Sequence, residues 1–287
     1  PITYQKLLII KSGICIFARH KKKDMDIKDK WVWITGASSG IGRALAIEFS
    51  YHGCNLVLLS RNIAELEVTA GKCNPNIKAI IQSIDLSDPT SITGAVAHLR
   101  VKNTPLDILV NNGGISQRSA AIETQDGVAR KIFDINYFGT VNLTKALLPQ
   151  MIEKGGGQIA VITSLVGIIG SPKRTSYAAS KHALHGYFDS LRAELFNEKI
   201  KVTIICPGFI RTNISLSAVT GDGQAQNKMD EKTDSGMEPS KLAKIAVKGI
   251  ANQKEEIYIG GKEILAIYLK RFVPGIFSRI LRNAKVT

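Results

Sequence analysis

The sequence predicts an α/β protein with a doubly wound, seven-stranded and mainly parallel sheet that has helices on both faces. From Lys30 onward, short runs rich in β-branched residues alternate with helix-length segments. Parallel strands need long right-handed crossovers, and helices of this length supply them. The seven predicted strands are WVWIT (31–35), NLVLLS (55–60), IKAIIQSI (77–84), DILV (107–110), QIAVIT (158–163), KVTIIC (201–206) and EIYIG (256–260).

Between these strands lie two long predicted helices, from about Gln125 to Met151 and from Ser176 to Glu198. The polar stretch SAVTGDGQAQNKMDEKTDSGME, residues 217–238, is the long linker-like segment of the sequence. Its length suits a mobile lid over a substrate. The sequence shows no internal repeat.

The composition is that of an ordinary globular protein. The chain has 287 residues, of which 44% are hydrophobic and 6% aromatic, and we expect a single domain over residues 25–261. The cysteines (Cys15, Cys54, Cys73 and Cys206) form no CxxC pair and lie near no histidine cluster in the sequence. This spacing argues against a metal site or a disulfide framework and suits a reducing, cytoplasmic location.

The basic charge is concentrated at the two ends of the chain. The formal net charge is +14, of which residues 1–24 contribute +5 and residues 262–287 another +5. The remaining +4 is spread over the middle of the chain. A terminal excess favours a surface-binding tail over a groove that reads nucleic-acid bases, so no nucleic-acid partner is expected.

Residues 1–24 do not match a folded element. The apolar run LLIIKSGICIFA, residues 7–18, is shorter than the roughly 20 residues of a membrane-spanning helix. Basic residues follow it where a signal peptide would have its cleavage site. We expect these residues to be a non-native or flexible extension with a native start at Met25; a membrane-surface anchor is the alternative.

The C-terminal tail, residues 262–287, is basic and amphipathic. Within ILAIYLKRFVPGIFSRILRN, Pro274 and Gly275 divide the tail into two short helices. Its apolar residues either cover a substrate cleft or subunit contact, or lie in the interface of an anionic membrane. The second interpretation predicts a peripheral membrane contact and a lipid-like substrate.

Ligands of doubly wound sheets bind beyond the carboxyl ends of the strands, so the residues after each strand are the candidates for a site. TGASSGIG follows the first strand and contains Gly36, Gly40 and Gly42. Glycines permit a tight turn and close backbone approach, and the following helix offers free amides to a pyrophosphate. Such turns also occur for geometric reasons alone.

Later strand ends add further candidates. After the second strand, Arg61 either pairs with the 2′-phosphate of NADP or simply enters a helix capped by Asn62. Asp85 after the third strand either meets the adenine amino group or begins a turn. The small residues of NNGG, 111–114, leave room for a flat ring after the fourth strand.

Taken in order and spacing, these motifs resemble the short-chain dehydrogenase/reductase family over roughly residues 29–260. The motifs are TGASSGIG, NNGG, Asn136 in DINYFGT, Ser164 in ITSLVG, YAASK and PGFIRT. NNGGISQRS together with GYFDSLRAEL most resembles the dehydrogenase/reductase member 7 subgroup. Two departures are Gly113, where the family commonly has NNAG, and Ser39, where some NADP-using relatives carry a basic residue.

The resemblance implies a Rossmann fold and an NADP-dependent exchange between a carbonyl compound and an alcohol, with NAD as the alternative cofactor. Tyr177 and Lys181 are four residues apart and therefore share one helix face. A free tyrosine has a pKa of about 10, which a nearby cation lowers. By resemblance, Tyr177 is the general acid or base, and Lys181 also binds the nicotinamide ribose. Ser164 holds the substrate oxygen, and Asn136 positions a water that links Lys181 to solvent.

Each of these four residues also has an ordinary structural explanation when taken alone, and only the ordered set favours catalysis. His182 and His185 are expected to be structural. The resemblance also implies a homodimer or homotetramer that packs through the two long helices. The residues expected to contact the cofactor are Gly36, Ser38, Ser39, Gly40, Ile41, Gly42, Arg61, Asp85, Leu86, Asn112, Gly113, Gly114, Tyr177, Lys181, Pro207, Gly208, Ile210 and Thr212.

Two other classes of function remain open at this point. A catalytically silent dinucleotide-binding regulator would share the glycine-rich turn but would not need the set of Asn136, Ser164, Tyr177 and Lys181. A nucleic-acid-binding protein is suggested by net charge alone. The sequence names neither the substrate nor the direction of the reaction.

Overall fold

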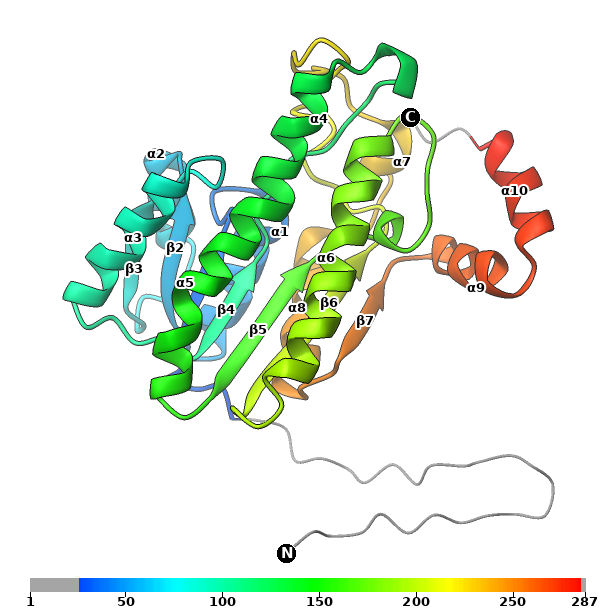
Figure 1. The fold of residues 1–287 in the computed structure, drawn as a ribbon. Coiled ribbons are helices and arrows are strands. Elements are labelled where there is room, and N and C mark those ends of the chain that lie inside the picture. Colours follow the sequence, from blue (N-terminus) through cyan, green and yellow to red (C-terminus); the bar gives the residue numbers. More distant parts are fainter. Residues whose placement is uncertain (1–25, 285–287) are drawn as a thin grey trace, which may run out of the picture.

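Seven strands form one parallel sheet in the order β3-β2-β1-β4-β5-β6-β7 (Figure 1). The computed structural model of the chain describes residues 26–284. The predicted extension at residues 1–24 and the predicted start at Met25 lie outside the described residues. The strands are β1 (Trp31–Thr35), β2 (Asn55–Ser60), β3 (Ala79–Ser83), β4 (Ile108–Asn111), β5 (Gly157–Ile162), β6 (Ile200–Pro207) and β7 (Glu256–Ile259). The predicted fold class is therefore confirmed.

Helices cover both faces of this sheet (Figure 1). Side chains of α1 (Gly40–Tyr51), α2 (Ile63–Gly71) and α8 (Pro239–Ala251) pack with Val32, Ile34, Leu56 and Leu58 into one core cluster. Side chains of α3 (Pro89–Val101), α5 (Thr140–Glu153) and α6 (Thr175–Glu194) pack on the other face. Because successive residues of a strand point to opposite faces, β1 sends Trp33 into the second cluster.

The long helix predicted from Gln125 to Met151 is continuous but not uniform. It consists of α4 (Asp126–Phe133), a π-helical turn at Asp134–Gly139, and α5. The other long helix, α6, ends at Glu194 rather than at Glu198. The chain reverses there through a turn in which Lys199 takes a φ of 56°, directly before β6.

The tail forms two short helices, as predicted from Pro274 and Gly275. These are α9 (Leu265–Phe272) and α10 (Pro274–Arg282), which project past β7 at one side of the molecule (Figure 1). Ile267 and Phe277 are buried in the same core cluster as α6. The domain boundaries at 24/25 and 261/262 stay predictions. Within residues 26–284, no helix combines the length and apolarity needed to cross a bilayer.

Candidate active site

A cavity of about 1060 Å³ lies at the carboxyl ends of the strands. The strand order reverses between β1 and β4, which is where open α/β sheets form ligand crevices. The cavity is continuous from the turn after β1 to the first turns of α6 and the inner side of α9 and α10. Its volume exceeds the usual range for a single small-molecule site, so it can accommodate a cofactor together with a substrate.

The turn after β1 has the backbone form of a nucleotide cradle. Gly36 and Gly40 have φ angles of 64° and 51°, which disfavour any residue with a side chain. A Cβ on Gly42 would lie 2.2 Å from the carbonyl oxygen of Gly36, so α1 can approach the turn only with glycine there. The first turn of α1 therefore presents its free amides at the cavity, where they fit a pyrophosphate.

Arg61 and Asp85, predicted at the ends of β2 and β3, lie beside each other. The Arg61 Nη1 atom is 3.9 Å from Asp85 Oδ2, and the Arg61 side chain is 66% exposed. Ser38, Ser39 and Arg61 line the cavity, whereas Asp85 does not. Asp85 Oδ1 accepts hydrogen bonds from the amide and hydroxyl of Ser87, which is the turn that the alternative interpretation described.

Both interpretations of Arg61 find structural support. Asn62 caps α2 by accepting a hydrogen bond from the Glu65 amide. Arg61 nevertheless lines the cavity, as Ser38 and Ser39 do. Sequence reasoning missed Arg43, whose guanidinium donates to the Ser38 carbonyl and pairs with Glu65 close to the same corner.

The NNGG segment after β4 is fixed against β1. The amides of Asn112 and Gly113 both donate to Thr35 Oγ1, each at 2.9 Å. A Cβ on Gly113 would lie 2.5 Å from Leu86 Cδ1, so Leu86 occupies the space that the alanine of the common NNAG motif would need. An alanine at position 113 would therefore require the Leu86 side chain to move. Leu86, Asn112, Gly113 and Gly114 all line the cavity.

Tyr177, Lys181 and Ser164 converge at the buried end of the cavity. Tyr177 and Lys181 are 8% and 4% exposed, and Lys181 Nζ lies 5.9 Å from the Tyr177 ring centroid. Lys181 donates a 2.9 Å hydrogen bond to the carbonyl oxygen of Ile162 at the end of β5. Ser164, two residues further on, donates a 3.3 Å hydrogen bond to the carbonyl oxygen of Pro207, and its hydroxyl acts to lower the pKa of Tyr177.

Burial disfavours the charged forms of Tyr177 and Lys181. It raises the pKa of the Tyr177 phenol, an effect opposed by the positive charge of Arg174, the Ser164 hydrogen bond and Arg118. Burial also lowers the pKa of Lys181 to about 8, although Cys206 acts to raise it. Lys181 is therefore still mainly charged at neutral pH and is poised to titrate just above it.

Asn136 lies in the π-helical turn and does not line the cavity. Its side chain accepts a 2.8 Å hydrogen bond from the Ile115 amide and donates to the Ile115 carbonyl and to Ser180 Oγ, each at 3.0 Å. π-Helical turns commonly occur at functional sites because they redirect one residue out of the helical register. Here Asn136 links the segment after β4 to α6, next to Lys181.

The PGFIRT segment after β6 borders the cavity opposite Tyr177. Pro207, Gly208, Ile210 and Thr212 all line it. A Cβ on Gly208 would lie 2.1 Å from Glu263 Oε1, which also accepts a hydrogen bond from the Phe209 amide at 3.2 Å. Glu263 thus couples the first residues of the tail to this segment. The side chain of Thr212 reaches back to the glycine-rich turn at Gly40.

Two features near the site were missed in the sequence. Gln117 is fully buried, and its Oε1 accepts hydrogen bonds from the amides of Ser176 and Tyr177 at 2.8 and 3.1 Å, so it caps α6 from a distant loop. Arg118 and Arg174 line the cavity and share the buried carboxylate of Asp230. Gln117 and Arg118 belong to the motif NNGGISQRS, which was read for family resemblance alone, whereas no motif pointed to Arg174 or Asp230.

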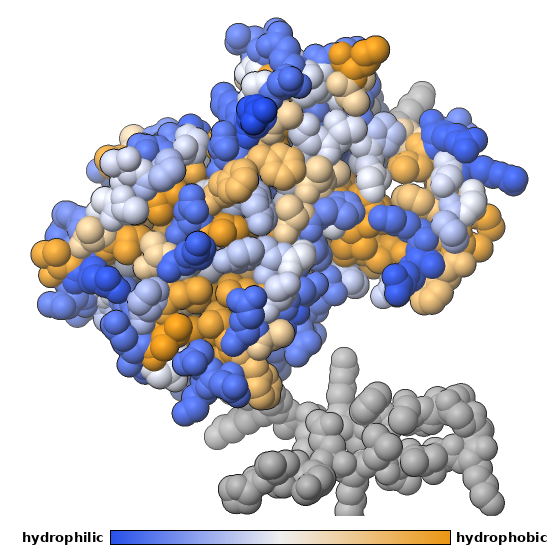
Figure 2. Space-filling model, viewed as in Figure 1, coloured by the Kyte–Doolittle hydropathy of each residue, from blue (hydrophilic) through white to orange (hydrophobic). Residues whose placement is uncertain are grey.

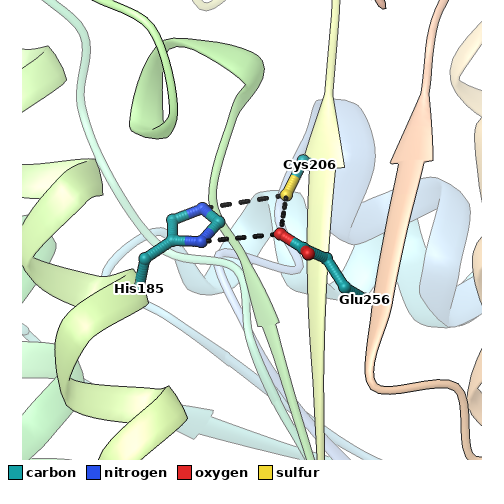
Figure 3. A group of neighbouring side chains, drawn as sticks. All are labelled: His185, Cys206 and Glu256. Atoms are coloured by element: carbon teal, nitrogen blue, oxygen red, sulfur yellow. Dashed lines mark hydrogen bonds and ion pairs between the residues drawn. The ribbon is translucent and has the colours of Figure 1, made fainter. Parts of the chain in front are cut away.

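A further missed feature is a cluster of His185, Cys206 and Glu256 (Figure 3). The two ring nitrogens of His185 face Cys206 Sγ and Glu256 Oε1, each at 3.7 Å. These are zinc-ligand types whose ligand atoms lie within 4.8 Å of one another, so this is a place where a metal could be held. Burial raises the pKa of the Cys206 thiol to about 12, which keeps it protonated and favours a hydrogen-bonded link between α6, β6 and β7.

The structure therefore brings nearly all predicted site residues to one cavity. The exceptions are Gly42, Asp85 and Asn136, which do not line the cavity but contact residues that do. The predicted residues that line it are Gly36, Ser38, Ser39, Gly40, Ile41, Arg61, Leu86, Asn112, Gly113, Gly114, Ser164, Tyr177, Lys181, Pro207, Gly208, Ile210 and Thr212.

Comparison with known proteins agrees with this geometry. The family model described as short chain dehydrogenase matches residues 30–222. The chain is 40% identical over 265 residues to dehydrogenase/reductase SDR family member 7B of Bos taurus, covering 90% of this chain and 82% of that protein. It is also 40% identical over 263 residues to dehydrogenase/reductase SDR family protein 7-like of Drosophila melanogaster, covering 90% and 81%.

Solved structures share the fold at low sequence identity. A short chain dehydrogenase/reductase from Burkholderia phymatum in complex with NAD superposes with a TM-score of 0.77 at 20% identity, covering 88% of this chain and 96% of that one. An alcohol dehydrogenase from Thermococcus sibiricus complexed with 5-hydroxy-NADP gives a TM-score of 0.69 at 24% identity, covering 81% and 97%. The extent of the family match and the identity to curated relatives show that this chain belongs to the short-chain dehydrogenase/reductase family of oxidoreductases.

Proposed function

We propose that this protein is an NADP-dependent oxidoreductase that interconverts a ketone or aldehyde with an alcohol. The observation that carries the proposal is that Tyr177, Ser164 and Lys181 line the buried end of the same cavity whose other end is the glycine-rich turn. A catalytically silent regulator would need the turn but not this convergent polar set. The catalytic and cofactor-binding roles of the site residues are part of the same proposal.

The residues present fit a nicotinamide dinucleotide. The turn at Gly36–Ile41 would hold the pyrophosphate, and the Asn112–Gly114 segment and Lys181 would border the nicotinamide ribose. Pro207, Gly208, Ile210 and Thr212 would contact the nicotinamide end. When bound, the cofactor supplies the hydride for reduction or accepts it in oxidation.

The chain's own residues supply the proton and the substrate orientation. The Ser164 hydroxyl would donate to the substrate oxygen and place it beside the Tyr177 phenol. Tyr177 would donate its proton to that oxygen in reduction and accept a proton in oxidation. The positive charges of Lys181, Arg174 and Arg118 favour the phenolate that remains. Asn136 holds the Ile115 backbone next to Lys181, where the resemblance implies a water that links the lysine to solvent.

NADP is proposed over NAD because Arg61 borders the cavity beside Ser38 and Ser39, where a 2′-phosphate would lie. Of the structural neighbours, one is a complex with NAD and another is a complex with 5-hydroxy-NADP, so the fold itself accommodates both. The curated relatives of this chain carry names that specify neither cofactor.

We further propose a homo-oligomer and a cytoplasmic location. Aromatic side chains of α4, the π-helical turn and α6 pack edge-on against one another, and these elements belong to the two long helices that the resemblance assigns to subunit contact. The described cysteines are buried free thiols, which suits a reducing compartment.

The test is a steady-state assay of the purified full chain with NADPH and NADH against a panel of ketones, aldehydes and alcohols. Tyr177→Phe should reduce kcat by about 10²- to 10⁴-fold and leave cofactor affinity within a few-fold, because only the proton donor is lost. Lys181→Ala should impair both kcat and cofactor affinity. Tyr187→Phe, a phenol on the same helix that does not line the cavity, is the matched control. Near-normal turnover by Tyr177→Phe would refute the mechanism, and cofactor binding without turnover of any substrate would favour the regulator.

A further inference from the structure

The outer faces of α9 and α10 expose apolar side chains at helical spacing. On α9, Leu265, Tyr268 and Phe272 are 61%, 50% and 75% exposed. On α10, Ile276 and Ile280 are 51% and 54% exposed. Residues three, four or seven apart lie on one helix face, so each helix carries an apolar stripe directed away from the core. Figure 2 shows hydrophobic and hydrophilic surface side by side on this part of the molecule. Clustered exposure of this kind marks an interaction surface.

Positive charge accompanies this surface. Residues 264–284 contain no aspartate or glutamate, whereas Arg271, Arg279 and Arg282 are all exposed. A fourth cation, Lys270, donates to the Ile168 carbonyl and holds α9 against the body. The surface is therefore apolar and basic at once, as in helices that lie in the headgroup region of an anionic bilayer.

The inner faces of the same helices line the catalytic cavity. Ala266 and Leu269 of α9 and Phe277 and Leu281 of α10 contribute apolar wall to the cavity that contains Tyr177. Ile280 both lines the cavity and is half exposed. The two helices thus form part of the wall between the cavity and the outside.

We propose that α9 and α10 dock on the surface of a membrane that contains anionic lipid, and that an apolar carbonyl or alcohol substrate enters the cavity from that membrane past Ile280. The membrane contact is inferred from the surface of α9 and α10 and does not depend on the proposed function, whereas the substrate route rests on the proposed function. A second copy of this chain fits the surface less well, because face-to-face packing would bring the three exposed arginines of each copy together.

The membrane contact is tested by co-sedimentation of the full chain with phosphatidylserine–phosphatidylcholine vesicles and with pure phosphatidylcholine vesicles. Wild type should bind the mixed vesicles and lose binding as salt is raised. Phe272→Ser with Ile276→Ser should weaken this binding by at least about tenfold, since two exposed apolar anchors that do not line the cavity are removed. Ile122→Ser with Val101→Ser, which alters side chains that are 96% and 83% exposed elsewhere, should leave it unchanged.

Charge is tested separately. Arg279→Glu with Arg282→Glu should abolish the preference for the mixed vesicles, and Lys244→Glu with Lys248→Glu on exposed positions of α8 should preserve it. No binding by wild type, or equal loss in the control pairs, would overturn the proposal. So would a change of oligomeric state in Phe272→Ser with Ile276→Ser, measured by light scattering, without any change in vesicle binding.

The substrate route is tested by kinetics. Relative to wild type, Phe272→Ser with Ile276→Ser should turn over a short water-soluble ketone at an unchanged rate and a long-chain ketone delivered in vesicles several-fold more slowly. Equal effects on both ketones would contradict the route. Tyr177→Phe should bind vesicles as wild type does, so a failure of the proposed chemistry leaves the membrane result intact and distinguishable.

Discussion

Arg118 and Asp230 form a buried ion pair across 112 positions of sequence, with Arg118 Nε 2.9 Å from Asp230 Oδ2. Their side chains are 4% and 2% exposed, and Arg174 Nη2 lies 3.4 Å from the same carboxylate oxygen. Asp230 belongs to the polar segment 217–238, and Arg174 lies just before α6. The segment that the sequence predicted as a mobile lid is thus anchored near Tyr177. A motion of this segment would either keep Asp230 in place or break its ion pairs with Arg118 and Arg174.

Asp230→Asn should destabilise the protein by about 3–5 kcal/mol, because it leaves two buried guanidinium groups without their carboxylate. Urea unfolding of the purified chain measures this. Asp222→Asn changes an exposed carboxylate of the same segment and should have little effect. Equal stability of wild type and Asp230→Asn would show that the ion pair does not anchor the segment.

The same pair predicts a pH dependence. Burial alone would raise the pKa of Asp230, but the hydrogen bond and charge of Arg118 hold it below its usual value. A carboxyl group with a depressed native pKa contributes stability above its unfolded pKa of about 4, and this contribution is lost as the pH falls through the native pKa. The stability difference between wild type and Asp230→Asn should therefore shrink in acid and stay constant from pH 6 to pH 8.

What the sequence could predict was local. The strands at 31–35 and 55–60 match β1 and β2 residue for residue, because short, mainly apolar runs between turn signals determine them. The candidate site was predicted because its residues follow strand ends, which one edge of a parallel sheet must bring together. The π-helical turn at Asn136 was not predicted; its last residue, Gly139, lies so close to the Leu86 backbone that a Cβ there would be 2.2 Å from the Leu86 carbonyl oxygen, a contact that local spacing does not show.

Contacts between side chains that lie far apart in the sequence could not be predicted either. Gln117 caps α6 from 59 positions away, and no spacing rule connects a loop glutamine with a particular helix start. Cys206 lies on β6, His185 on α6 and Glu256 at the start of β7, so their proximity follows only from the packing of these elements in the fold. The Gln117 contact with the Tyr177 amide fixes the start of the helix that carries Tyr177 and Lys181.

Lys181→Met should stabilise the ligand-free protein at pH 7 while it abolishes activity. The native pKa of Lys181 is about 8, below its unfolded value, so the folded state resists the charged lysine at neutral pH. Removing that charge is worth roughly 3 kcal/mol, offset by about 1 kcal/mol for the lost hydrogen bond to Ile162. The melting temperature should rise by several degrees.

The sign of this stability effect can be checked by measuring the stability of both proteins as a function of pH. Between about pH 8 and pH 10.5 the unfolded state binds the proton that the native state has released, so wild-type stability should rise with pH relative to Lys181→Met. Lys244→Met, on the exposed surface of α8, is the control. A melting temperature of Lys181→Met below that of wild type at pH 7 would contradict the prediction.

Arg61→Asp should shift cofactor preference from NADP toward NAD by about 10- to 100-fold in kcat/KM. The substitution removes a charge-assisted contact worth about 1.5–3 kcal/mol and places a carboxylate beside Asp85, where it would repel a 2′-phosphate. Kinetics with both cofactors measure the ratio. Asp85→Asn retains Arg61 and should retain the NADP preference. A wild-type enzyme that already prefers NAD would refute the role of Arg61.

Phe138→Glu should convert the proposed oligomer into monomers. Phe138 is 50% exposed and packs edge-on against Tyr137 with ring centroids 5.1 Å apart, and Tyr137 in turn packs against Tyr187 of α6 at 6.3 Å. This aromatic cluster spans the two helices that the resemblance assigns to the subunit contact, and hydrophobic surface is visible over them in Figure 2. Aromatic side chains are enriched in subunit interfaces, where a buried unpaired carboxylate costs several kcal/mol. Sedimentation velocity at micromolar concentration should show the change, and Ile122→Glu, at a 96% exposed position, should not dissociate the protein. A wild-type chain that sediments as a monomer would contradict the proposed assembly.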